Sequence, residues 1–389
     1  MGTGPFTHSG RYAGAHIIWT RETRYKLERD NMNQVRPAAP QLADIEPYDP
    51  KYIPADVMIS ANENSADVPF ELRREIEREI RRVAFNRYPD PLANDLRDLI
   101  AEANGLDRDQ VLMSNGGDEL LFGLALAWGG PGRKFLNMPP TFSVYKNNAQ
   151  LTNTTIVDVP RLPDFSIDED AVIERLQQGD IDYTIVTSPN NPSGNRVHTA
   201  FVKRMLEAAD TLVMVDEAYF EFSRHTVRHL LEQYDNLVIL RTLSKAFSLA
   251  GVRMGYVFGS ADVLREFKKV RQPYSVDAVS QAIARVVYAN RSEFEHGIDQ
   301  IIEQRTRLFD ELSAMEAVEP FPSDANYILF RLAAGIDAGQ VWQRLLDAGV
   351  LVRDFSRSPG LENCLRVSIG SPEENTRFLE ELKKTLRNE

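Results

Sequence analysis

The chain has 389 residues, of which 43% are hydrophobic and 26% are charged, and its formal net charge is -12. This length exceeds what one small core needs, and it predicts two or three domains. The acidic balance argues against nucleic acid or an anionic membrane as a partner, because both attract clustered Lys and Arg. One cysteine, Cys364, excludes an internal disulfide and a Cys/His metal site. No apolar run is long enough to span a bilayer, so we expect a cytoplasmic protein.

The N-terminal region differs from the remainder. Residues 1–32 are rich in Gly, Thr, Arg and His without a clear period, and they predict no element of the fold. They could be a disordered arm, an expression scar, or sequence ahead of a true start at Met32. The next stretch, to residue 57, contains five prolines, which favours an extended arm. Residues 1–57 are therefore predicted to be an N-terminal extension and arm.

The next 230 or so residues alternate between two patterns. An apolar stripe from Glu71 to Val83 predicts an amphipathic helix, and the apolar run 120–128, bounded by glycines, predicts a buried helix. Short apolar runs that predict strands are 111–113, 134–138, 155–159, 183–187, 211–215 and 237–240. Such strands alternating with helices indicate a mostly parallel sheet covered on both faces. We therefore predict an α/β, three-layer αβα large domain over residues 58–290.

The pattern changes after residue 290. A long charged helix is expected from about Arg291 to Met315, followed by strands at 326–331, 350–353 and 365–369. The last helix is expected to begin at Ser371–Glu374, where Ser and Glu have capping-box spacing and Pro occupies the first helical position. Residues 291–389 are thus predicted to form a smaller α+β C-terminal domain.

Three stretches at predicted strand ends carry candidate chemistry. Lys245 lies within Arg241–Tyr256 (RTLSKAFSLAGVRMGY), among small and hydroxylated residues and eight positions before Arg253. Ser188–Gly194 (SPNNPSG) and Val213–Tyr219 (VMVDEAY) follow two further strands. Alone, each could be a surface loop, a Pro/Asn turn or a helix cap. Together they mark the carboxyl edge of the sheet, where open α/β sheets bind ligands.

A fourth stretch suits an anion. Gly116-Gly117-Asp118 stands directly before the apolar helix. Backbone amides at a helix N-terminus bind anions, and glycine lets a ligand approach closely. The alternative is a simple turn and cap.

From about Ile45 to the end, these stretches resemble the fold type I (class I/II) pyridoxal-phosphate-dependent aminotransferases, with the closest likeness to the histidinol-phosphate aminotransferases. Further segments that carry the resemblance are Ala61–Asn64, Asn86–Pro89, Ser114–Glu119, Pro139–Phe142, Ser323–Asn326 and Gly360–Arg366. The resemblance implies the αβα large domain with a smaller C-terminal domain, pyridoxal 5'-phosphate as cofactor, and a dimer.

The resemblance also implies roles for individual residues. Lys245 would hold the cofactor as a Schiff base and then move the proton as general base and acid. Asp216 would pair with the pyridine nitrogen and keep it protonated. Asn191 and Tyr219 would hydrogen-bond the ring hydroxyl oxygen, and Phe142 would stack on the ring, where the family more often has Tyr.

The phosphate and the substrate would have their own residues. Those implied for the cofactor phosphate are Gly117, Asp118, Thr242, Ser244, Arg253 and, from the neighbouring subunit, Tyr88. Arg366 would grip the acidic group of the substrate, with Arg353 and Tyr48 as helpers.

The function implied is transfer of an amino group from histidinol phosphate to 2-oxoglutarate, in histidine biosynthesis. Other amino donors, aromatic ones among them, and a pyridoxal-phosphate decarboxylase on the same scaffold stay open, since a fold does not fix a reaction. A transcription regulator with an aminotransferase-like domain would need a DNA-binding module ahead of the core. The roughly 45 residues there lack a helix-turn-helix pattern.

Overall fold

The computed structural model describes residues 38–42, 45 and 53–387. The chain divides into two compact units, residues 1–44 and 45–389. The first unit contains one described element, the 3-10 helix η1 (Pro40–Leu42), and all other described elements belong to the second unit. Within the described residues, no helix combines the length and the apolar character needed to cross a bilayer.

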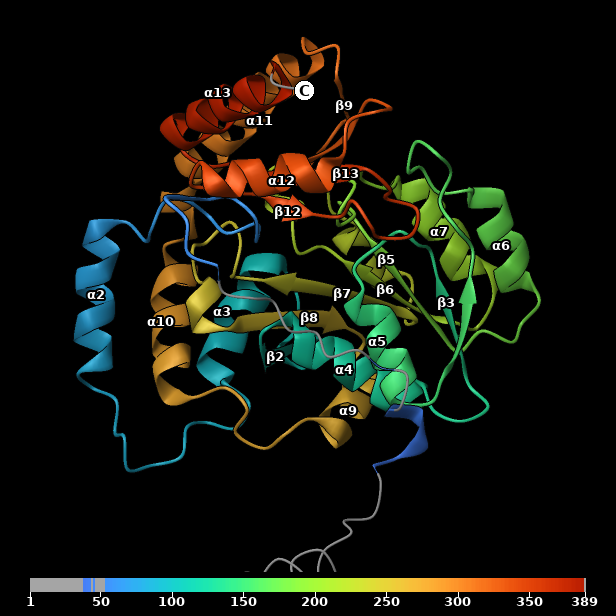
Figure 1. Cartoon of the computed structure of the whole chain (residues 1–389). Coiled ribbons are helices and arrows are strands. Elements are labelled where there is room, and N and C mark those ends of the chain that lie inside the picture. Colours follow the sequence, from blue (N-terminus) through green and yellow to red (C-terminus); the bar gives the residue numbers. More distant parts are fainter. Residues whose placement is uncertain (1–37, 43–44, 46–52, 388–389) are drawn as a thin grey trace, which may run out of the picture. The chain divides into compact units, whose positions relative to one another are not determined.

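A seven-stranded sheet with the order β2-β8-β7-β6-β5-β3-β4 forms the centre of the larger part (Figure 1). Its strands are β2 (Val111–Asn115), β3 (Lys134–Asn137), β4 (Thr155–Asp158), β5 (Tyr183–Thr187), β6 (Leu212–Asp216), β7 (Leu237–Thr242) and β8 (Met254–Gly259). All run parallel except β8, which is antiparallel to both its neighbours. The predicted strands and the mostly parallel sheet are confirmed. β8 was not predicted, because its two glycines weaken the strand pattern.

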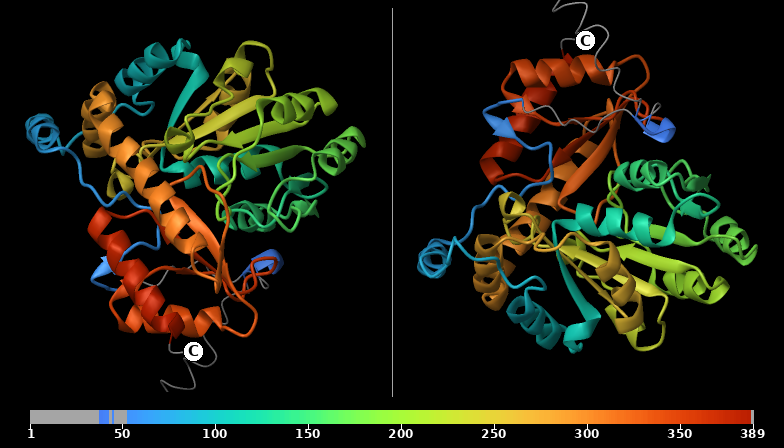
Figure 2. Two further views of the ribbon diagram at one scale, coloured as in Figure 1. Left: turned by 90° about the horizontal axis from the view of Figure 1, so that it is seen from above. Right: turned by 90° about the horizontal axis from the view of Figure 1, so that it is seen from below.

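Both faces of this sheet are covered by apolar clusters. Successive side chains of a strand point to opposite faces, so neighbouring residues belong to different clusters. On β2, Leu112 belongs to one apolar cluster and Met113 to the other. Helices α4 (Gly117–Trp128), α5 (Val144–Leu151) and α9 (Ala261–Val270) supply the first cluster. The second cluster includes buried residues of α3 (Asn94–Asn104), α6 (Glu169–Gln177), α7 (Thr199–Ala208) and α10 (Ala278–Ala289). Figure 2 shows the resulting layers, and α2 (Phe70–Ile80) packs outside on α10.

The C-terminal part is built on a four-stranded antiparallel sheet with the order β12-β13-β10-β9. Its elements are η5 (Arg291–Phe294), α11 (Glu295–Ser313), β9 (Val318–Pro320), β10 (Tyr327–Leu332), α12 (Ala338–Asp347), β11 (Val350–Leu351), β12 (Arg353–Asp354), β13 (Cys364–Ser368) and α13 (Pro372–Arg387). The capping box is confirmed: Ser371 N–H donates to Glu374 Oε2 over 2.8 Å, and Glu374 N–H donates to Ser371 Oγ over 3.2 Å. β1 (Val57–Met58) pairs in parallel with β11.

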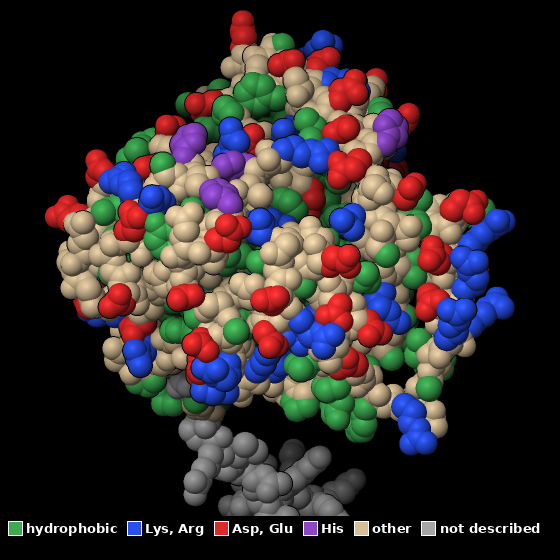
Figure 3. Space-filling view, turned by 180° about the vertical axis from the view of Figure 1, so that it is seen from behind, with side chains coloured by type: hydrophobic (Ala, Val, Ile, Leu, Met, Phe, Trp, Pro, Cys, Tyr) green, Lys and Arg blue, Asp and Glu red, His purple; other side chains and the backbone are tan. Residues whose placement is uncertain are grey.

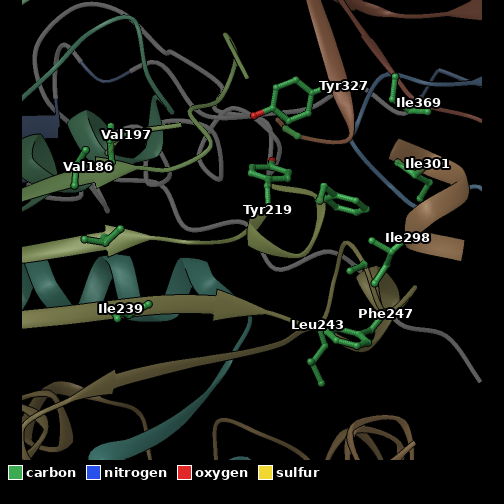
Figure 4. Close-up of a cluster of buried hydrophobic side chains, with 14 of the residues drawn as sticks. Val186, Val197, Tyr219, Ile239, Leu243, Phe247, Ile298, Ile301, Tyr327 and Ile369 are labelled. Atoms are coloured by element: carbon green, nitrogen blue, oxygen red, sulfur yellow. The ribbon is translucent and has the colours of Figure 1, made fainter. Parts of the chain in front are cut away.

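One apolar cluster is continuous between the two parts. Tyr219, just beyond β6, meets Tyr327 of β10 edge to face, with ring centroids 5.1 Å apart (Figure 4). Ile298 and Ile301 of α11 belong to the same cluster. Through this contact, β10 of the C-terminal sheet lies close to the carboxyl end of β6. The predicted domain boundary at 290/291 stays a prediction.

On the face shown in Figure 3, Lys and Arg side chains are interspersed with Asp and Glu. Exposed ion pairs are common among the described residues, for example Arg82 with Glu79 and Arg265 with Asp262. Such pairs add little to stability in water.

Candidate active site

The predicted motifs meet at one edge of the central sheet. β5 and β6 end beside each other, with Thr187 and Asp216 in register, and β7 lies next to β6. The segment with Asn191 leaves β5, the segment with Tyr219 leaves β6, and the Lys245 loop leaves β7. The structure therefore brings these three separate stretches together at the carboxyl ends of the strands, as the sequence predicted.

Lys245 is partly buried in the loop that joins β7 to β8. Its Nζ donates a hydrogen bond to the carbonyl oxygen of Ala61 over 3.1 Å. Burial of the ammonium, followed by the positive charges of Arg366 and Arg253, lowers the pKa of Lys245 to about 8. A lysine whose neutral amine forms this readily can act as a nucleophile and as a base near neutral pH.

Asp216 is a buried carboxyl group with a defined donor on each oxygen. The backbone N–H of Ala218 donates to Oδ1 over 3.0 Å, and the hydroxyl of Tyr145 donates to Oδ2 over 2.6 Å. Burial raises the pKa of Asp216 to about 6, while the Tyr145 and Ala218 hydrogen bonds act in the opposite direction. The two hydrogen bonds thus favour the carboxylate form of Asp216, which is the form that would pair with a protonated pyridine nitrogen.

Tyr145 was not predicted from the sequence. It is fully buried on α5, three residues after Phe142, and the two rings meet edge to face with centroids 5.5 Å apart. Its hydroxyl also lies 2.7 Å from Thr187 Oγ1. Because the Tyr145 hydrogen goes to Asp216, Thr187 donates to the tyrosine oxygen. Its partner Asp216 lies 71 positions away in the sequence, so no local pattern identifies it.

Replacing Tyr145 by phenylalanine is expected to raise the pKa of Asp216 by about one pH unit or more, since a hydrogen bond to a charged group is lost. A carbon-13 NMR titration of aspartate-labelled protein measures this, with Asp216→Asn used to assign the resonance. Thr187→Val leaves the Tyr145–Asp216 bond in place and should change the midpoint less. An unchanged midpoint in Tyr145→Phe would show that the hydroxyl does not stabilise the carboxylate.

The predicted anion site is built around the start of α4. This helix begins at Gly117 without a side-chain cap. A Cβ on Gly116 would lie 2.6 Å from Arg253 Nη2, and a Cβ on Gly255 would lie 2.6 Å from the Gly117 nitrogen. Glycine at both positions lets Arg253 and β8 approach the helix N-terminus. Arg253 Nη2 also lies 3.2 Å from Asp118 Oδ2.

The hydroxyl groups of Thr242 and Ser244 come from the end of β7 and just beyond it, next to β8. Thr242 pairs in register with Gly255, and its Oγ1 lies 3.0 Å from Ser244 Oγ. Amides, hydroxyls and one guanidinium at a helix N-terminus form a suitable cradle for a phosphate.

Arg366 is buried on β13, and it contacts both the segment after β5 and the segment before α2. Its guanidinium donates to Asn191 Oδ1 and, over 2.8 Å, to the carbonyl oxygen of Ser60. It lies over the rings of Tyr327 and Phe355, at 5.0 and 5.4 Å from their centroids. Arg353 is its register partner on β12 and lies 5.8 Å from the same Phe355 ring. The structure thus groups the two predicted arginines about Phe355, a residue that the sequence did not single out.

The remaining predicted residues are placed differently. Tyr88 lies between α2 and α3, is 81% exposed, and stacks on Tyr274 with centroids 4.5 Å apart. Tyr48 lies outside the described residues.

Comparison with known proteins identifies the family of this chain. The family model described as aminotransferase class I and II matches residues 56–382. Histidinol-phosphate aminotransferase 1 of Carboxydothermus hydrogenoformans is 39% identical over 355 residues, which cover 91% of this chain and 100% of that protein. Among solved structures, the histidinol-phosphate aminotransferase from Clostridium acetobutylicum has a TM-score of 0.79 at 24% identity, over 86% of this chain and 100% of that one.

A second solved structure shares the fold. It is the histidinol-phosphate aminotransferase from Sinorhizobium meliloti in complex with pyridoxal-5'-phosphate, with a TM-score of 0.77 at 23% identity, over 86% of this chain and 92% of that one. The expected fold type I architecture is confirmed. The chain belongs to the class I and II aminotransferase family, and it is a transaminase.

Proposed function

We propose that this enzyme transfers the amino group of histidinol phosphate to 2-oxoglutarate, using pyridoxal 5'-phosphate. The observation that carries the proposal is the arrangement around Lys245: a lysine of lowered pKa, a buried carboxylate and a buried arginine, joined to an anion cradle. The choice of histidinol phosphate as amino donor rests on the name of the relative of 39% identity, whose whole length this chain matches.

The residues present fit the proposed cofactor group by group. The start of α4 with Arg253, Ser244 and Thr242 suits its phosphate. Asp216 suits a protonated ring nitrogen, and Phe142 offers an aromatic face. When bound, pyridoxal phosphate would supply a sink for the electrons released as the substrate loses its Cα proton.

The chain's own groups would then manage protons and hydrogen bonds. Lys245 would take the proton from the substrate Cα as a base and donate it to the cofactor carbon as an acid. Asn191 accepts from Arg366 through Oδ1, so its Nδ2 would be the atom that donates to the ring hydroxyl oxygen. Tyr219 would donate to that same oxygen.

The substrate's anionic end would lie at Arg366 and Arg353. A planar guanidinium binds a phosphate or a carboxylate by two parallel hydrogen bonds, so one pair of arginines can serve the phosphate of the donor and the carboxylates of the 2-oxo acid. Tyr48 is proposed as a helper at this end.

We further propose a cytoplasmic homodimer in which Tyr88 reaches the cofactor phosphate of the neighbouring subunit. Its exposure supports this proposal, since a tyrosine ring that is 81% exposed on a monomer is available to a partner.

The experiment is a visible spectrum of the protein reconstituted with pyridoxal phosphate, before and after histidinol phosphate is added without an oxo acid. Loss of the cofactor band, and its return with 2-oxoglutarate, is the expected result. A band that responds to phenylalanine or tyrosine but not to histidinol phosphate would retain the class and replace the donor. Release of carbon dioxide from an amino acid would indicate a decarboxylase, and no band at all would remove the cofactor assignment.

A further inference from the structure

Three consecutive residues contact three different groups of the site. The carbonyl oxygen of Ser60 accepts from Arg366, and that of Ala61 accepts from Lys245. The side-chain Nδ2 of Asn62 donates to the hydroxyl oxygen of Tyr219 over 3.0 Å. This short segment therefore connects the arginine, the lysine and the tyrosine, which otherwise belong to separate stretches of the chain.

Asn62 is held by several hydrogen bonds. It is 1% exposed, and its backbone has a φ of 57°, a left-handed conformation that asparagine tolerates better than most residues. Its N–H donates to Ser368 Oγ over 2.9 Å, and its carbonyl oxygen accepts from Asn326 Nδ2 over 3.1 Å. Both partners lie in the C-terminal part of the chain.

The Ser368 contact assigns the orientation of the Asn62 amide. Ser368 Oγ accepts the backbone N–H of Asn62 and donates its own hydrogen to Asn62 Oδ1 over 3.1 Å. With Oδ1 used in this way, Nδ2 faces Tyr219 as a donor. A tyrosine oxygen that accepts this bond directs its own hydrogen away from Asn62.

We propose that Asn62 is a positioning residue that fixes the direction in which the Tyr219 hydroxyl donates. The inference rests on the proposed function, in which Tyr219 donates to the ring hydroxyl oxygen of the cofactor. A donor at that oxygen favours its ionised form, and it therefore lowers the pH at which the visible band of the bound cofactor changes.

The test is a pH titration of that band in Asn62→Asp. This change keeps the size, the tolerance of positive φ and an acceptor for Ser368, but it replaces the donor to Tyr219 by an oxygen. The Tyr219 hydroxyl should turn toward this new acceptor. The midpoint should rise by about one pH unit, with a fall in kcat of about tenfold and little change in KM.

The charge and the fold each need a control. Asn64→Asp makes the same chemical change two residues along, where the side chain contacts Ala246 O and Ala66 N–H instead of Tyr219. Its midpoint should move much less, and an equal movement would show that charge alone is responsible. Asn62→Gly tolerates the backbone conformation and removes the amide without adding charge. It should reproduce the direction of the change, and it replaces Asn62→Asp if that variant does not fold.

The decisive comparison uses Tyr219→Phe. Because Asn62 is inferred to act through the hydroxyl, Asn62→Gly should shift the midpoint in the parent protein and add nothing in the Tyr219→Phe background. Additive effects, or an unshifted midpoint in both Asn62 variants, would overturn the inference. If the parent protein forms no visible band with pyridoxal phosphate, the proposed function fails instead, and that outcome is distinct.

Discussion

Replacing Lys245 by alanine is expected to abolish transamination, with a loss of more than about 10⁴-fold, the upper range for removal of general acid–base catalysis alone. The reason is that this side chain would serve both as the attachment point of the cofactor and as the carrier of the substrate proton. Its lowered pKa, to about 8, makes the neutral amine available for both tasks. The measurement is a steady-state assay, accompanied by a visible spectrum after incubation with pyridoxal phosphate.

A surface lysine provides the matched control. Lys203 on α7 is an exposed side chain that pairs with Glu207, so Lys203→Ala should retain the parent rate and spectrum. Lys245→Arg keeps the positive charge but offers no neutral amine near pH 7, and it should be as inactive as Lys245→Ala. Substantial turnover in either Lys245 variant would contradict the role proposed for this residue.

Much of this site depends on one rule about sheets. Lys245, Asp216, Asn191 and Tyr219 each lie at or just beyond the end of an apolar strand, and parallel strands present their carboxyl ends at the same edge. The short strands and the helix-start glycines are local features, so the αβα layers and the anion cradle could also be predicted from the sequence.

Other contributors could not be predicted, because their roles depend on contacts between distant parts of the chain. Asn62 and Ser368 are 306 positions apart, and Tyr145 and Asp216 are 71 apart. Phe355 lies in a short polar stretch without a period, and its nearness to both Arg353 and Arg366 follows from the register of β12 with β13. β8 was missed because its two glycines weaken the strand pattern. One of them, Gly255, allows β8 to approach the N-terminus of α4.

Asp216→Asn is expected to retain the cofactor and to lose most of the rate, at least about a hundredfold in kcat, which is typical when one preorganised electrostatic partner is removed. The amide is nearly the same size. Its oxygen can still accept from the Ala218 N–H, and its NH2 group can donate to the Tyr145 oxygen while the Tyr145 hydrogen turns to Thr187 Oγ1. It carries no negative charge, however, and so cannot stabilise a protonated ring nitrogen. Binding of pyridoxal phosphate, followed by absorbance, should change less than kcat, because the phosphate cradle and Lys245 are intact.

Two further samples separate this electrostatic role from a structural one. Asp216→Glu keeps the carboxylate and should be more active than Asp216→Asn, although its longer side chain disturbs the bonds to Tyr145 and Ala218. Reconstitution of Asp216→Asn with a pyridoxal phosphate methylated at the ring nitrogen supplies a permanent positive charge without a proton. If Asp216 acts by keeping that nitrogen protonated, part of the lost rate should return with the methylated cofactor. If the rate stays low while binding is normal, the carboxylate acts through the position of the ring, and Tyr145 and Phe142, whose rings contact each other, become the residues to vary next.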